Sequence, residues 1–131
     1  MKRLLATLAL ATVALAAAAC SSTNADTATP GASAGPVDPN APAIVADGMK
    51  FTTAQVQVPA GRAFSLAFDN KDGAPHNVAI YIDSSAGTNV FRGDIFGGPA
   101  SKAYDVPALA AGTYFFRCDV HPDMTGTIVA K

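Results

Sequence analysis

The chain has 131 residues, which is enough for one domain. Nine Lys and Arg stand against ten acidic residues, all of them Asp, and two of the basic residues are Lys2 and Arg3. The remaining balance of seven basic to ten acidic residues is not the electrostatic signature of a nucleic-acid-binding protein, which needs a clustered basic face. Only two His and two Cys are present, so any site built from these residue types must draw on very few positions.

Residues 1–19 have the pattern of an export signal. Lys2 and Arg3 are followed by an apolar run from Leu4 to Ala19. This run is shorter than the ~20 residues of a membrane-spanning helix, and it ends in small residues, as secretory signals do. Ala17-Ala18-Ala19-Cys20 is similar to the signal of bacterial lipoproteins, and this resemblance implies a lipid on Cys20. Cleavage after Ala19 without lipid attachment is the alternative and would release the protein.

Residues 20–42 form the next segment and are rich in Ala, Ser, Thr and Pro. This composition buries too little apolar surface to offset the entropy of ordering the chain, so we predict a disordered tether. With a lipidated Cys20, the tether would hold a domain at residues 43–131 in the periplasm or at the outer face of the cell membrane.

From Ala43 onward the pattern changes to short β-branched and aromatic runs separated by turn residues. Phe64, Leu66 and Phe68 alternate with small residues, which is the period of a half-buried strand. The segment 83–99 is irregular, with room for a short strand or a flap. We predict an all-β, monomeric domain, a Greek-key sandwich or barrel of about seven to eight strands. The predicted strands are Ile44–Ala46, Met49–Phe51, Gln55–Val58, Ala63–Asn70, Asn77–Ile82, Ser101–Val106, Gly112–Cys118 and Gly126–Ala130.

Metal-binding residue types concentrate near the C-terminus. Cys118 is followed by His121 and Met124 at intervals of three, in the loop between the last two predicted strands. His76 opens a strand about forty residues earlier, and a sandwich can bring such segments to the same end. Two imidazoles, one thiolate and a weak thioether are the ligand set of a blue-copper electron-transfer site. The spacing therefore predicts one copper ion bound by His76, Cys118, His121 and Met124.

Each of these residues also has an ordinary explanation. A lone Cys is often a small buried hydrophobe, and a Met often fills a gap in a core. A disulfide between Cys20 and Cys118 is a further alternative in an exported chain. Zinc accepts Cys and His, although it rarely takes a thioether, so it explains Met124 less well. The combined pattern favours copper over these alternatives.

The same residues carry a resemblance to a known family. Phe116-x-Cys118-x-x-His121-x-x-Met124-x-Gly126 is similar to the ligand loop of the cupredoxins, in its short amicyanin form. Pro75-His76-Asn77 resembles the first-ligand motif of that family. The resemblance implies a type 1 copper site in which Met124 is the axial ligand. It also implies that the Asn77 backbone N–H meets the Cys118 sulfur and that the Asn77 side chain joins the two ligand segments.

The resemblance further implies a one-electron carrier whose port is His121, within an apolar patch drawn from Met49, Ala74, Pro75 and Pro122. A cytochrome or another copper protein would be its redox partner.

Copper buffering or delivery is the alternative function. An enzyme is not expected, because a multicopper site needs more His and a catalytic Cys–His pair leaves the Met unexplained. Asp119 and Asp123 either steer a basic partner or are solvated loop charges. We favour the second explanation.

Overall fold

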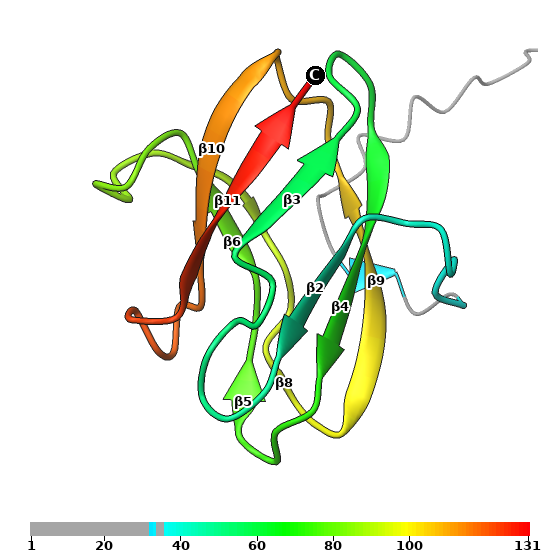
Figure 1. Cartoon of the computed structure of the whole chain (residues 1–131), viewed down its shortest axis with the longest axis vertical. Helices are drawn as coiled ribbons and strands as arrows, with labels where there is room; N and C mark the ends of the chain where they lie inside the picture. Colours follow the sequence, from blue (N-terminus) through cyan, green and yellow to red (C-terminus); the bar gives the residue numbers. More distant parts are fainter. Residues whose placement is uncertain (1–31, 34–35) are drawn as a thin grey trace, which may run out of the picture.

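The computed structural model describes residues 32–33 and 36–131, and these fold into a sandwich of two sheets (Figure 1). The first sheet has the order β1-β9-β4-β2 and consists of β1 Ala32–Ser33, β9 Ala100–Val106, β4 Phe64–Asn70 and β2 Ala43–Ala46. The second has the order β3-β11-β10-β6-β7 and consists of β3 Gln55–Val58, β11 Thr125–Ala130, β10 Gly112–Arg117, β6 Ala79–Tyr81 and β7 Asn89–Arg92. A separate antiparallel pair joins β5 Pro75–His76 to β8 Phe96–Gly97.

The core forms where the inner faces of the two sheets meet. Leu66 and Phe68 of β4 are fully buried, and Phe116 of β10 is buried opposite them. Phe51 bridges the sheets, with its ring centroid 6.2 Å from that of Phe68 and 5.2 Å from that of Phe116. Such aromatic pairs add about 1 kcal/mol each beyond the area that they bury. The alternation in the sequence is therefore the alternation of core and surface.

The predicted all-β sandwich is confirmed, but the predicted strand at Met49–Phe51 is wrong. Phe51 makes only an isolated bridge with Ala46. Gly48 and Met49 have φ angles of 64° and 60°, which belong to a turn and not to a strand. The Asp47 amide closes this turn by donating to the Lys50 carbonyl over 3.0 Å. The apolar appearance of Met49 was misleading, because its side chain is 50% exposed.

Two further segments add short strands. The irregular stretch 83–99 contributes β7 and β8, so of the two predicted alternatives it forms short strands and not a flap. Ala32 and Ser33 lie in the predicted tether, yet they pair with Tyr104 and Ala103 of β9. The edge of β9 offers unpaired backbone groups for this pairing, and the predicted disorder of the tether stays a prediction.

The predicted signal, residues 1–19, and Cys20 lie outside the described residues. Within the part of the chain that is described, no helix has the length and hydrophobicity to cross a membrane.

Candidate metal centre

The ligand loop connects β10 to β11 and is closed by its own backbone. The Cys118 amide donates to the Met124 carbonyl over 3.0 Å, and the Met124 amide donates to the His121 carbonyl over 2.9 Å. These two bonds fold the seven-residue segment into a tight turn. His76 approaches it from β5, which is held against β8 at the same end of the sandwich.

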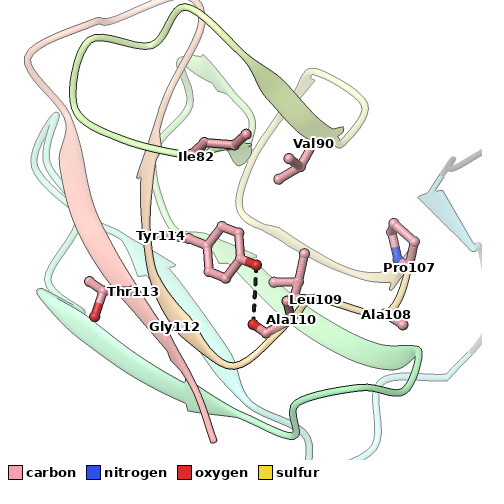
Figure 2. Close-up of a pocket in the computed structure, with 9 residues that line it drawn as sticks. All are labelled: Ile82, Val90, Pro107, Ala108, Leu109, Ala110, Gly112, Thr113 and Tyr114. Carbon is pink, nitrogen blue, oxygen red and sulfur yellow. Dashed lines mark hydrogen bonds between the residues drawn. The ribbon is translucent and has the colours of Figure 1, made fainter.

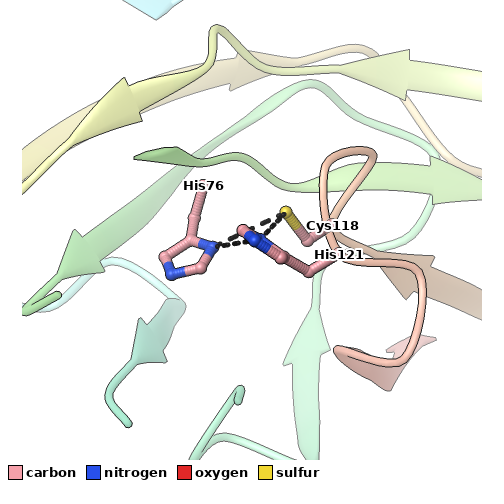
Figure 3. Close-up of side chains that lie close together, drawn as sticks. All are labelled: His76, Cys118 and His121. Atoms are coloured by element: carbon pink, nitrogen blue, oxygen red, sulfur yellow. Dashed lines mark hydrogen bonds between the residues drawn. The ribbon is translucent and has the colours of Figure 1, made fainter. Parts of the chain in front are cut away.

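Three of the predicted ligands converge on one point (Figure 3). The Cys118 sulfur lies 3.8 Å from His76 Nδ1 and 3.9 Å from His121 Nδ1. The two Nδ1 atoms are 3.0 Å apart. A metal ion in proteins lies about 2.0 Å from imidazole nitrogen and about 2.3 Å from thiolate sulfur. Because each measured separation is shorter than the sum of the two bonds involved, one ion can reach all three donors, and the residues fit a single metal.

Met124 lies in the same buried region. Its side chain is 2% exposed and belongs to the cluster that contains Cys118 and Phe116. The loop therefore places a thioether inside the sandwich, where water does not compete with it. That Met124 is an axial ligand stays a prediction.

Asn77 joins the two ligand segments through its side chain. Its Oδ1 accepts the Asp119 amide over 2.8 Å, and its Nδ2 donates to Asp119 Oδ2 over 3.0 Å and to the Gly93 carbonyl over 3.1 Å. The residue is fully buried. These are the cross-loop contacts that the family resemblance implies. The predicted bond from the Asn77 backbone to the Cys118 sulfur stays a prediction.

Asp72 was not predicted from the sequence, yet it is hydrogen-bonded to the predicted ligand His76. Its carboxylate accepts the Gly48 amide over 2.8 Å, the Met49 amide over 3.0 Å and His76 Nε2 over 3.1 Å. Hydrogen bonds from the Met49 and Gly48 amides, and then from His76, hold the pKa of Asp72 below its usual value. Since Nε2 of His76 is bonded to Asp72, Nδ1 is left facing Cys118, as in carboxylate–histidine–metal arrangements.

Asn70 holds the segment that leads to His76 through hydrogen bonds from its side chain. It is fully buried, donates to the Ala74 carbonyl over 2.9 Å and to the Phe96 carbonyl over 2.8 Å, and accepts the Asp72 amide over 3.0 Å. The available signal was an Asn at the end of an alternating strand, directly before a turn that leads to His76.

Asp119 differs from the solvated loop charge that the sequence favoured. Its carboxylate accepts hydrogen bonds from Tyr81 Oη over 2.8 Å and from Asn77 Nδ2 over 3.0 Å, and it forms an ion pair with Arg92 Nε at 2.9 Å. The hydrogen bond to Tyr81 and the charge of Asp119 raise the pKa of Arg92 above its usual value. Asp119 is therefore a structural acceptor that connects the ligand loop to the second sheet.

A cavity of about 320 Å³ lies elsewhere in the fold (Figure 2). It opens beside Gly112 at the start of β10, whereas Cys118 follows the end of that strand. Its lining is apolar around Leu109 and Ile82, with the Tyr114 hydroxyl donating to the Ala110 carbonyl over 3.1 Å. The cavity and the metal centre are thus separate features at opposite ends of one strand.

The fold and the site together define a small β-sandwich protein with a mixed nitrogen and sulfur metal centre. A family model described as a cupredoxin-like domain matches residues 7–130. The chain therefore belongs to the cupredoxin-like family.

Two amicyanins are similar to this chain in sequence. Amicyanin from Paracoccus versutus is 31% identical over 83 residues, which cover 63% of this chain and 59% of the relative. Amicyanin from Paracoccus denitrificans is 31% identical over 101 residues, which cover 71% of this chain and 73% of the relative. The chain thus spans less than two thirds of the first relative and about three quarters of the second.

Solved structures agree with the fold. The crystal structure of amicyanin from Paracoccus versutus matches with a TM-score of 0.57 and 29% identity, covering 72% of this chain and 85% of that one. A reduced auracyanin from Roseiflexus castenholzii matches with a TM-score of 0.59 and 19% identity, covering 68% and 94%. The second match supports the fold alone.

Proposed function

We propose that the protein binds one copper ion through His76, Cys118, His121 and Met124 and carries single electrons outside the cytoplasm. The observation that carries this proposal is the convergence of one thiolate and two imidazoles on a single point. Copper, when bound, supplies two oxidation states one electron apart. A solved structure of an amicyanin variant, 25% identical to this chain, is described as a Cu(I) form.

The surroundings of the donors favour electron transfer over release of the metal. His76 and Cys118 are fully buried, and Asp72, Asn70 and Asn77 hold their segments through hydrogen bonds. A donor set that is fixed in this way changes little between oxidation states, so little reorganisation opposes electron transfer. Buffering or delivery of copper would instead require that the ligands open.

His121 is the proposed port for electrons because it is the partly exposed member of the donor set. Exposed apolar side chains lie on the segments around it. Val120 is 41% exposed in the ligand loop, and Met49 is 50% exposed on the turn that Asp72 holds. Ile95, next to the residue that pairs with His76, is 52% exposed. A redox partner such as a cytochrome needs only a small contact of this kind.

Location is the second part of the proposal. The positive start, the short apolar run and the small residues before Cys20 support export and attachment of a lipid to Cys20. The mass of the protein purified from membranes tests this. We expect a chain that begins at a lipid-modified Cys20, and an unmodified chain in the soluble fraction would contradict the anchor.

Protein-film voltammetry tests the carrier function. The purified mature chain, loaded with one equivalent of copper, is expected to give a reversible one-electron couple with fast interfacial exchange. Slow, irreversible exchange accompanied by loss of copper on reduction would contradict the carrier and support copper delivery. The metal content before and after cycling separates the two outcomes.

A further inference from the structure

The outer face of the second sheet carries basic side chains and, at its paired positions, no carboxylate. The core residue Ile80 points inward, so its neighbours Ala79 and Tyr81 point outward. The pairing register places Arg117 and Arg92 on either side of Ala79. The outward residues paired with Arg117 or with Tyr81 are uncharged, namely Thr125, Phe115 and Asn89, and the next residues along the same row, Thr127 and Gln55, are uncharged too.

The two arginines converge on Tyr81. The Arg117 guanidinium carbon lies 5.0 Å from the centre of the Tyr81 ring. Arg92 Nη2 lies 3.4 Å from the Tyr81 hydroxyl. Among the described residues only the Asp119 carboxylate contacts this group, so two positive charges lie beside one negative charge. An excess positive charge is thus fixed on a chain whose overall charge is negative.

The contacts that join Asp119 to Tyr81 and Arg92 do not account for Arg117. Arg117 Nε is buried and has no hydrogen-bond partner within the described residues. Buried polar atoms are nearly always paired, so an unpaired one calls for an explanation. The Arg92 side chain is 59% exposed, although it is ion-paired and hydrogen-bonded. The exposed Arg92 side chain is therefore open to a partner that carries negative charge.

The opposite face of the sandwich has the reverse charge. Leu66, Phe68 and Asn70 of β4 are buried, so Asp69 points away from the core. Ser65 points the same way and pairs with Asp105 of β9. One face is therefore acidic and the other basic, and this separation orients the molecule in the field of a charged partner.

We propose that Arg92 and Arg117, gathered around Tyr81, form a docking surface for an acidic patch on a redox partner protein. This inference rests on the proposed electron-carrier function and adds a second contact area to the apolar surroundings of His121. Arg117 directly precedes Cys118, and Asp119 directly follows it. A partner on this face is thus connected to the buried Cys118 by the hydrogen bond from Tyr81 to Asp119 and by the peptide bond between Asp119 and Cys118.

Binding of poly-L-glutamate, used as a stand-in for an acidic protein surface, tests the proposal. The isotope-labelled mature chain, metal-free or loaded with diamagnetic Cu(I), is titrated at low salt, and amide shifts are followed by NMR. The largest shifts are expected at Arg92, Arg117 and their paired neighbours, with loss of binding as salt rises. Because binding needs no electron transfer, failure of the carrier function would not alter this result.

Matched variants make the test specific. Removing both charges, in R92Q/R117Q, is expected to weaken binding about tenfold, as the loss of two exposed ion pairs would. R92K/R117K keeps the charges and is expected to bind nearly as well as the parent. R62Q removes an exposed charge from the turn between β3 and β4 and serves as the control. Equal weakening by R62Q and R92Q/R117Q, or shifts centred elsewhere on the chain, would overturn the proposal.

Discussion

Replacing Asn77 by alanine is expected to lower the free energy of unfolding of the metal-free protein by about 3 kcal/mol. The change removes three hydrogen bonds at a fully buried position. It leaves the Asp119 amide and the Gly93 carbonyl without these partners and creates a cavity between the ligand segments. Urea unfolding of the metal-free protein, followed by fluorescence of the tyrosines or by circular dichroism, measures the loss.

Asn89→Ala is the matched control for this change. Asn89, like Asn77, donates two hydrogen bonds from its side chain, here to the backbone carbonyls of Ile80 and Phe91, but it lies exposed at the sheet edge. Water replaces its bonds, so the expected loss is below about 1 kcal/mol. If the two variants lost the same stability, the argument that Asn77 braces the centre from within would be wrong.

Replacing Gly98 by alanine is expected to destabilise the protein by about 3 kcal/mol or more. A Cβ at this position would overlap the Asn70 carbonyl oxygen and lie 2.7 Å from that of Asp72. Both are backbone atoms of the segment that leads to His76, and the Gly98 amide donates to the Asp72 carbonyl over 2.8 Å. Relief of the overlap must therefore displace the segment that carries the first predicted ligand. Thermal unfolding of the metal-free chain measures the effect.

Gly73→Ala provides the comparison within the same region. A Cβ on Gly73 meets no atom within 4 Å, and its backbone is not in the left-handed region. We expect a change within about 0.5 kcal/mol. A large loss of stability for Gly73→Ala would mean that this segment tolerates no substitution. The loss of stability in Gly98→Ala could then not be attributed to the clash of its Cβ.

The sequence was sufficient to predict the sandwich and the meeting of three donors. Leu66 and Phe68 showed the alternation of a buried strand, and the structure buries both. Cys118 and His121 share one short loop, so their proximity is local and follows from spacing alone. His76 was harder to place, and its position depended on the tendency of sandwiches to collect loops at their ends.

The supporting contacts could not be predicted because they join residues far apart in the chain. Asp72 is hydrogen-bonded to Gly48 and Met49, which lie 24 and 23 positions away in the sequence. Asn77 is hydrogen-bonded to Asp119, which lies 42 positions away. No periodic pattern marks such pairs. The turn at Gly48 and Met49 was misread for the same reason: the carboxylate that holds it in a left-handed conformation comes from Asp72.

The most direct measurement for the copper assignment is the visible spectrum of the purified mature chain after addition of one equivalent of Cu(II). Two imidazoles and a thiolate that bind one ion predict an intense thiolate-to-copper charge-transfer band in the parent. The band should be absent from Cys118→Ser, which keeps the shape of the side chain but removes the sulfur. A parent that shows no such band, or a Cys118→Ser variant that retains it, would contradict the type 1 copper centre proposed for this protein.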